Sequence, residues 1–194
     1  MLRSARRMEK IRQVLGKRQP GLTVVMENIH DPHNVSAVFR TCDAVGVMQV
    51  ELLYTTEKFP RIGKKSSSSA NKWLERRHHQ SVDECYRTLR NEGFRIYATH
   101  LGSDTVSLYD LDLTQKVALV FGNEHRGVSE EAAAKADGNF LIPMLGMIQS
   151  LNVSVAAAVS LYEALRQCLA CGTKNRSALT PEEIEAWYED WVQR

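Results

Sequence analysis

The sequence predicts an α/β fold in which helices flank a mostly parallel sheet. Short apolar runs alternate with segments of helical period along most of the 194 residues, which is typical of strands joined by helices. Residues 117–121 are nearly all apolar, as expected for a central strand buried on both faces. The composition, 43% apolar and 25% charged, is that of one globular domain with short appendages. It excludes a disordered tail, a disulfide miniprotein and a large multidomain assembly.

The first strand and the helix after it follow from local patterns. Residues 22–26 predict a strand, and a helix is expected from near Asn34. The side opposite its apolar stripe carries Ser36, Arg40 and Asp43, which leaves Arg40 pointing away from the packed face and available for chemistry. The stripe itself, which repeats at the helical period, consists of Val35, Val38, Phe39 and Cys42.

The middle of the chain continues the alternation of strands and helices. Gly46 should end the first helix, and residues 47–54 predict the next strand. Residues 61–71 lack an apolar period and predict a basic loop. A helix is expected at 82–91, with Gly93 as its C-cap.

The second half adds further strands and a long helix. Residues 94–99 predict a strand beside the apolar strand described above. Ser129 should cap a short helix, because its side chain can accept from the first free backbone amides. Residues 140–142 predict the last strand, and an Ala/Val/Leu-rich helix is expected at about 153–169.

The end of the chain contains a helix-start signal, Thr180-Pro181-Glu182-Glu183, which is a capping box with proline at the first helical position. The helix that follows presents one apolar face, and that face must be buried either on its own domain or on a second subunit. Its residues are Ile184, Trp187, Tyr188 and Trp191.

Composition and charge suggest three parts. We expect a basic N-terminal helical arm at 1–20, the main domain at 21–170 and a C-terminal helical extension at 171–194. The net charge of +2 hides a segregation: residues 1–20 carry +6, residues 61–80 carry +5, and the remainder carries −9. Two basic patches on an acidic body fit a polyanion such as nucleic acid. The alternative is that these charges only keep a helix face and a loop in solvent.

The four cysteines are expected to be reduced, since a chain of this size needs no disulfides. Cys168 and Cys171 form a C-x-x-C pair, but no second pair completes a zinc site. A three-residue spacing along a helix is therefore the preferred interpretation, and no metal is expected. His78 and His79 lie in a basic stretch, where contact with phosphate or water is expected.

No apolar run approaches the roughly 18 residues that a membrane span needs, and the first residues lack the apolar core of a signal peptide. We therefore expect a cytoplasmic protein without a membrane part. None of the 11 glycines forms a G-x-G pair, and no G-x-x-x-x-G-K-[S/T] or G-x-S-x-G is present. These absences disfavour a Rossmann dehydrogenase, a kinase, a P-loop hydrolase and a nucleophile elbow.

Three segments resemble a known family. E-N-I-H-D-P-H-N-V-S-A-V-F-R-T-C-D-A-V-G at 27–46, L-V-F-G-N-E-H-R-G-V-S at 119–129 and I-P-M-L-G-M-I-Q-S-L-N-V-S-V-A-A-A-V at 142–159 are similar to the three motifs of the SpoU branch of the SPOUT RNA methyltransferases. The similarity is greatest to the TrmH-type branch, which methylates the ribose 2′-oxygen of guanosine 18 in tRNA. It extends over nearly the whole chain, and three motifs in the right order are far more specific than one.

The resemblance implies an α/β knot, a parallel sheet with a deep C-terminal trefoil, which is a rare exception to the rule that chains do not thread loops. It also implies an obligate homodimer with the site at the subunit interface. S-adenosyl-L-methionine would be held bent within the knot, largely by backbone groups, which agrees with the absence of a glycine fingerprint. The positions that match its contacts are Thr99, Gly122, Ile142 and Leu151.

The same motif matching assigns catalytic positions. Arg40 resembles the family's catalytic arginine, proposed to take the proton from the ribose 2′-hydroxyl, although a guanidinium normally stays charged. Either the substrate phosphate and Ser150 perturb Arg40 enough to make it the base, or Arg40 clamps the phosphate while another group accepts the proton. We favour the clamp with assisted deprotonation. The matching positions are Asn34, Arg40, Glu124, Ser150 and Asn152.

Simpler interpretations remain open for these residues. Asn34 would otherwise only cap its helix, and Asn152 or Ser150 would only cap the long helix. In the family-based interpretation Asn34 and Asn152 orient loop backbone or ribose. Glu124 fixes loop geometry or favours the cationic sulfonium.

The basic residues are expected to hold tRNA phosphates, so binding should weaken with salt. One departure from the family pattern is the loop Ser66-Ser67-Ser68-Ser69-Ala70-Asn71-Lys72-Trp73, where the family tends to have small residues with glycine near a Ser-Trp or Lys-Trp pair. Substrate contacts in that loop are the least transferable. The expected RNA-binding residues are Arg6, Arg7, Lys10, Arg12, Lys17, Arg18, Lys64 and Lys65.

The sequence thus predicts an enzyme that moves a methyl group from S-adenosyl-L-methionine to the 2′-oxygen of guanosine 18 in the tRNA D-loop. Orientation of the two reactants would supply most of the catalysis. One alternative is a ribosomal RNA ribose methyltransferase of the same superfamily. Another is an RNA-binding protein with a decayed knot and no activity.

Overall fold

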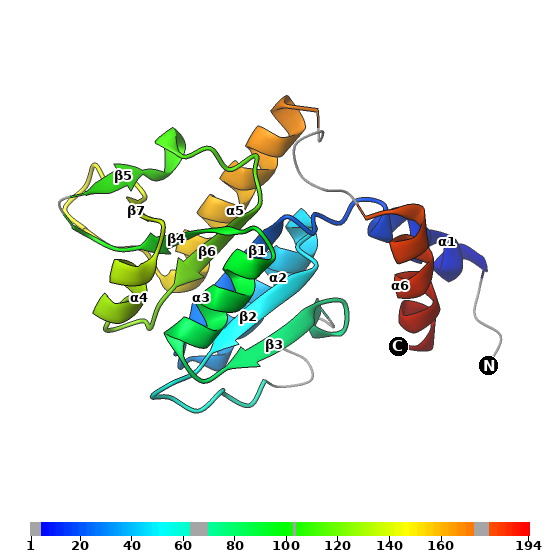
Figure 1. Ribbon diagram of the computed structural model, residues 1–194, viewed down its shortest axis with the longest axis horizontal. Coiled ribbons are helices and arrows are strands. Elements are labelled where there is room, and N and C mark those ends of the chain that lie inside the picture. Colours follow the sequence, from blue (N-terminus) through cyan, green and yellow to red (C-terminus); the bar gives the residue numbers. More distant parts are fainter. Residues whose placement is uncertain (1–4, 63–69, 103, 173–178) are drawn as a thin grey trace.

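The computed structural model describes residues 5–62, 70–102, 104–172 and 179–194. Within these ranges seven strands form one parallel sheet in the order β3-β2-β1-β6-β4-β7-β5 (Figure 1). This agrees with the predicted fold class. The strands are β1 (Leu22–Glu27), β2 (Gln49–Leu53), β3 (Glu75–His79), β4 (Arg95–Thr99), β5 (Thr105–Ser107), β6 (Val117–Phe121) and β7 (Gly138–Leu141).

Helices cover both faces of this sheet. Strand alternation sends Val24 and Met26 into a core with α2 and α5, and sends Val25 into a second core with α3 and α4. Figure 1 shows α3 and α4 on the near face. The helices are α1 (Ala5–Leu15), α2 (Pro32–Val45), α3 (Val82–Asn91), α4 (Glu130–Lys135), α5 (Val153–Ala170) and α6 (Pro181–Gln193), with 3₁₀ turns η1 (Ala70–Lys72) and η2 (Leu108–Asp110).

The first helix of the main domain starts earlier than predicted. Asp31 is its N-cap and accepts from the backbone N–H of His33 at 2.8 Å, with Pro32 in the first turn. The prediction of a start near Asn34 was therefore wrong by one half-turn. Ser36, expected on the exposed side, is buried. The predicted apolar stripe is buried throughout, and Gly46 ends the helix at φ 86°.

The predicted caps Ser129, Asn152 and Thr180 are confirmed, and Ser81 is a further N-cap that was not predicted. The prediction of Gly93 as the C-cap of α3 was wrong by one residue, since Glu92 is the C-cap and Gly93 follows it at φ 82°. Ser81, Ser129 and Asn152 cap α3, α4 and α5, each accepting from a backbone N–H in the first turn. Thr180 forms the complete capping box of α6 with Glu183. Local side-chain chemistry therefore fixes where these helices begin.

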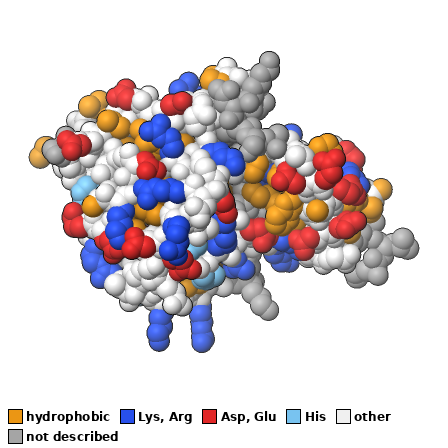
Figure 2. Space-filling model, viewed as in Figure 1, with side chains coloured by type: hydrophobic (Ala, Val, Ile, Leu, Met, Phe, Trp, Pro, Cys, Tyr) orange, Lys and Arg blue, Asp and Glu red, His pale blue; other side chains and the backbone are white. Residues whose placement is uncertain are grey.

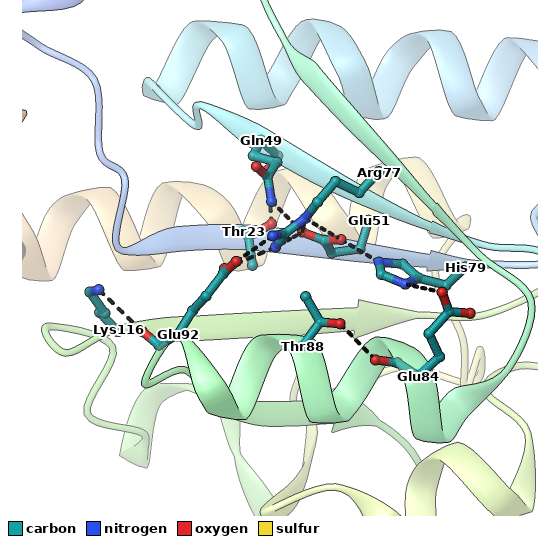
Figure 3. A network of polar contacts seen from close by, with 9 residues as sticks. All are labelled: Thr23, Gln49, Glu51, Arg77, His79, Glu84, Thr88, Glu92 and Lys116. Carbon is teal, nitrogen blue, oxygen red and sulfur yellow. Dashed lines mark hydrogen bonds and ion pairs between the residues drawn. The ribbon is translucent and has the colours of Figure 1, made fainter. Parts of the chain in front are cut away.

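Two edge strands, β3 and β5, were not predicted. β3 has the sequence Glu-Arg-Arg-His-His and lacks the apolar signal on which the prediction relied. It pairs with β2 because its inward side chains meet a buried carboxylate: Glu51 accepts from Arg77 at 2.7 Å and contacts His79 Nε2 at 2.6 Å (Figure 3). His79 is buried, so the expectation that it meets phosphate or water was wrong.

The C-terminal helix packs on its own chain, against α1, and the pair stands beside the sheet (Figure 1). Tyr188 and Trp191 are buried there with Ile11 and Leu15. Arg12 binds Glu185 at 2.6 Å and lies 3.8 Å above the ring of Tyr188. Of the two predicted partners for the apolar face of α6, the structure selects the same subunit.

Arg18 closes the junction between this helix pair and the sheet domain. Its side chain is 1% exposed, donates to the carbonyl of Val47 at 2.7 Å and pairs with Asp43 at 2.5 Å. Its guanidinium also lies over the ring of Trp191. Burial is the largest influence on the pKa of Arg18 and lowers it, against the opposing effect of Asp43. Arg18 was expected to bind RNA, and that prediction was wrong, because its donors are used inside the fold.

All four cysteines are free thiols. In the described ranges, His, Cys, Asp and Glu side chains do not gather in threes as a metal ion requires. The search for a membrane span in the same residues found no helix of sufficient length and apolarity.

Candidate functional site

The predicted cofactor positions meet at one edge of the sheet. Thr99, Gly122 and Ile142 directly follow or end β4, β6 and β7, which are neighbours in the sheet. The register pairs Ala98 with Val120 and Thr99 with Phe140, so the three carboxyl ends lie side by side. Ligands of open parallel sheets bind beyond such ends.

Gly122 is required by the loop that it opens. A Cβ atom there would lie 2.1 Å from the carbonyl carbon of Gly127, well inside van der Waals contact. Asn123 and Gly127 exchange two backbone hydrogen bonds at 2.9 and 2.8 Å. The Asn123 side chain accepts from the backbone N–H groups of His125 and Arg126. The loop 122–127 is thus a tight, internally bonded turn.

Glu124 projects from this turn and holds the loop after β1. Its carboxylate accepts from the backbone N–H groups of His30 and Asp31, both at 3.0 Å, and from Asn34 Nδ2 at 2.9 Å. Burial raises the pKa of Glu124, but these hydrogen bonds outweigh it and hold that pKa below its usual value. The carboxylate is therefore charged at neutral pH and acts as a loop clamp.

Asn34 extends the clamp to the third motif. Its Oδ1 accepts from Asn152 Nδ2 at 3.1 Å, and Asn152 Oδ1 accepts from the backbone N–H of Ser154 at 2.9 Å. Since Asp31 caps α2, the interpretation of Asn34 as a helix cap is wrong. Asn152 does cap α5, and it also joins the two motifs. A continuous set of hydrogen bonds thus runs from Glu124 through Asn34 to Asn152.

Arg40 and Ser150 are not part of this set. Both are exposed, and within the part of the chain that the structure describes neither side chain forms a hydrogen bond or ion pair. Arg40 follows Asn34 by six residues, which is roughly 9 Å along a helix axis. One subunit by itself does not bring all five predicted catalytic residues together.

The loop after β7 is apolar and exposed. Leu145, Met147 and Ile148 are each at least 73% exposed, and Leu151 is 38% exposed beside Asn152. Apolar side chains continue along α5 at seven-residue intervals: Val155, Tyr162 and Leu169 are exposed as well. An exposed apolar surface of this extent is unusual on a monomeric protein.

Part of the basic arm is engaged in ion pairs within the chain. Acidic side chains are prominent on the lobe formed by α1 and α6 (Figure 2), and one of them, Glu185, pairs with Arg12. Lys64 and Lys65 lie outside the described residues. The candidates that are exposed on the arm are Arg6, Arg7, Lys10, Arg12 and Lys17.

Sequence reasoning assigned no role to Asn28 and Glu27. Asn28 has φ 51°, a left-handed conformation that asparagine tolerates better than most residues. Its Oδ1 accepts from three consecutive backbone N–H groups, at 55–57, and its carbonyl accepts from Asn123 Nδ2. Glu27 accepts from Ser129. A polar pair directly after an apolar strand is the signal that would have identified them.

These features define a parallel α/β protein whose polar site joins three sequence motifs. A family model described as the SpoU rRNA methylase family matches residues 21–162, and the chain belongs to that family. A tRNA (guanosine(18)-2′-O)-methyltransferase of Thermus thermophilus is 47% identical over 192 residues, which cover 99% of this chain and 98% of that protein.

Two solved structures extend the comparison. The Aquifex aeolicus TrmH/SpoU tRNA modifying enzyme has a TM-score of 0.89 at 39% identity and covers 97% of this chain and 95% of its own. The SpoU methyltransferase AviRb of Streptomyces viridochromogenes, solved with AdoMet, has a TM-score of 0.70 at 28% identity and covers 79% and 62%. The predicted family and fold class are therefore confirmed.

Proposed function

We propose that this protein transfers a methyl group from S-adenosyl-L-methionine to the ribose 2′-oxygen of guanosine 18 in the tRNA D-loop. The observation that carries the proposal is the set of hydrogen bonds from Glu124 through Asn34 to Asn152, which joins all three motifs at the carboxyl edge of the sheet. The full-length similarity to enzymes with that printed activity supports it.

The residues at this edge fit the methyl donor. Thr99, Gly122 and Ile142 offer backbone groups at three adjacent strand ends, and Leu151 adds apolar surface. Gly122 adds no side chain at this edge, because a Cβ atom there would meet the backbone of Gly127. Bound there, the sulfonium would supply an electrophilic methyl group. The chain's own part is to orient the ribose and manage its proton.

We assign Arg40 to clamping the substrate phosphate, with two parallel N–H donors, while a neighbouring group assists loss of the 2′-hydroxyl proton. Ser150, exposed close to Asn152, is the candidate to orient that proton. Glu124, Asn34 and Asn152 keep the loops of the three motifs in register. Their role is positioning, because their polar atoms bond mainly to one another and to backbone.

The RNA would be held by the exposed basic residues of the arm, of which Lys10 in α1 and Lys17 just after it are examples. Each phosphate contact releases counterions, so affinity should fall as salt rises. We keep the three-part division at 1–20, 21–170 and 171–194. Residues 171–194 would support residues 1–20, because α6 packs on α1.

We further propose that two copies assemble through the exposed apolar surface on the 144–151 loop and α5. Burying Leu145, Met147, Ile148 and Tyr162 would remove a large apolar area from water. A partner subunit would also bring a second Arg40 toward the site that one chain leaves incomplete. We also propose that the C-terminal part of the fold forms a trefoil knot and that the protein is located in the cytoplasm.

Incubation with labelled methyl donor and unmodified tRNA, followed by mapping of the labelled nucleotide, tests this function. Label at the 2′-oxygen of guanosine 18 is expected. Label in ribosomal RNA alone would favour the ribosomal alternative. No label in either RNA would favour an inactive RNA-binding protein.

A further inference from the structure

A cleft of about 490 Å³ lies at the carboxyl ends of β1, β2, β3 and β6, next to the starts of α3 and α4. Its volume is within the range of ligand pockets, roughly 300–1,000 Å³. Residues that line it include Glu27, Asn28, Ser81, Arg126 and Glu131. None of these positions has been given a role in methyl transfer above.

Glu27 is the unusual group in this cleft. Its side chain comes from the end of β1, and the residue is 2% exposed. Its two oxygens accept from the Oγ and backbone N–H of Ser129, at 2.5 and 2.9 Å. Among the described residues no cationic side chain forms an ion pair with Glu27. A buried carboxylate of this kind is costly unless further donors reach it, and each oxygen has room for another hydrogen bond.

The loop 122–127 provides hydrogen-bond donors, whereas Glu27 provides an acceptor. Arg126 has a side chain that is 60% exposed and binds Glu57 at 2.8 Å through one nitrogen. A guanidinium carries five N–H donors in a plane, so several face outward from that pair. The cleft thus combines an acceptor at Glu27 with donors at Arg126. The presence of Glu131 as a second carboxylate disfavours a phosphate as the occupant.

We propose that this cleft binds the guanine base of the nucleotide whose ribose is methylated. Guanine presents two adjacent donors, N1–H and the 2-amino group, which a carboxylate accepts together, and two adjacent acceptors, O6 and N7, which arginine contacts. Adenine, cytosine and uracil lack the paired donors. RNA-binding sites commonly read the edges of bases that are splayed out of the stack.

The position of the cleft fits this role. Asn123 and Arg126 line it, while Gly122 and Glu124 of the same loop border the proposed methyl-transfer site. A base in the cleft and its ribose at that site would therefore contact neighbouring segments of one turn. This inference rests on the proposed function and assigns to it the element that selects guanosine.

Two tRNA transcripts test the inference, one with guanosine at position 18 and one with inosine, which lacks only the 2-amino group. The wild-type chain should methylate the guanosine transcript with a kcat/KM about tenfold or more above the inosine transcript, as expected when a hydrogen bond to a charged acceptor is lost. Glu27→Gln should bring this ratio close to one while leaving the KM for the methyl donor unchanged. Ser129→Ala is the matched control: it removes the hydroxyl bond to Glu27 but keeps the carboxylate, and should keep the wild-type ratio.

Each other outcome overturns the inference. Equal wild-type rates on the two transcripts, or an unchanged ratio in Glu27→Gln, would show that the 2-amino group is not read here. Loss of the ratio in Ser129→Ala as well would show that Glu27 acts only through the start of α4. A raised KM for the methyl donor alone in Glu27→Gln would make the cleft a cofactor site.

The wild-type comparison needs no variant, and it also separates this inference from the proposed function. A wild-type chain inactive on both transcripts refutes the function and the inference together, whereas an active chain without discrimination refutes only the inference. If Glu27→Gln does not fold, Arg126→Gln tests the donor side of the cleft instead. It should raise the KM for tRNA several-fold and leave the KM for the methyl donor unchanged, and an unchanged KM for tRNA contradicts the inference.

Discussion

Asn152 donates from Nδ2 to Oδ1 of Asn34 at 3.1 Å across 118 residues of sequence. Asn34 in turn donates to Glu124, so the loops of all three motifs share one set of polar contacts. Because each amide both donates and accepts within this set, its orientation is fixed by its neighbours. The residues at the centre of the site therefore determine where the loops lie before any ligand binds.

Replacing Glu124 with glutamine should separate the loops. The amide retains one acceptor oxygen where the carboxylate serves three donors, and its NH₂ group would oppose a backbone N–H. We expect a loss of about 1–3 kcal/mol in the free energy of unfolding and at least a tenfold fall in kcat/KM. Glu189→Gln, on the exposed side of α6, is the control. Wild-type activity in Glu124→Gln would refute the clamp.

Two substitutions at Asn152 distinguish its cap from its link to Asn34. Asn152→Asp keeps an acceptor for the start of α5 but loses the donor to Asn34, so it should retain the melting temperature and lose activity. Asn152→Ala should lose activity and also about 1 kcal/mol of stability. Thermal unfolding and methylation rates measured on both variants check this. Full activity in Asn152→Asp would show that Asn152 acts only as the cap of α5.

Arg18 and Lys10 should behave in opposite ways although both lie in the basic arm. Arg18→Ala removes a buried guanidinium from Asp43 and from the carbonyl of Val47, and should cost about 2–4 kcal/mol of stability. Lys10→Ala should leave stability unchanged and reduce the slope of log affinity for tRNA against log salt by about one. If the Arg18→Ala protein were stable and its log affinity for tRNA fell less steeply with log salt, Arg18 would be an RNA contact after all.

Acid should weaken the edge of the sheet at β3. Burial raises the pKa of Glu51, but its hydrogen bonds from His79, Arg77 and Gln49 outweigh this and lower that pKa below its ordinary value of 4.5. A lowered folded-state pKa stabilises the fold above pH 4.5 and loses this contribution as pH falls through the folded value. Urea unfolding from pH 7 to pH 3 should show a shallower acid slope in Glu51→Gln than in wild type. Parallel slopes in the two proteins would contradict the assignment to Glu51.

The proposed dimer surface is tested by Tyr162→Glu. A charge at the centre of the exposed apolar face of α5 should convert the dimer to a monomer in sedimentation experiments and abolish methylation. Arg87→Glu on the exposed side of α3 is the control and should leave both unchanged. A dimeric Tyr162→Glu protein with normal activity would rule out this surface.

Much of the fold could be predicted from local chemistry. Capping side chains such as Ser81 and Thr180 mark helix starts within a residue, and the period of the α2 stripe identifies its buried face. β3 could not be predicted because its inward residues, Arg77 and His79, are polar. His79 is buried and Arg77 half-buried because Glu51 of the next strand satisfies both.

The site was predictable in its residue types but not in its connections. Motif matching identified Asn34, Glu124 and Asn152, yet no spacing rule links residues that are 90 and 118 positions apart. The burial of Arg18 had the same cause, because it depends on Trp191 from the far end of the chain. Long-range packing decides which basic residues remain free for RNA.

The central claim is methyl transfer to the ribose 2′-oxygen of guanosine 18, and one pair of substrates tests it most directly. Two tRNAs that differ only in the presence of the 2′-hydroxyl at nucleoside 18 are incubated with labelled methyl donor. The account predicts one methyl group per intact tRNA, at that oxygen, and none on the 2′-deoxy form. Equal labelling of the two tRNAs would contradict it.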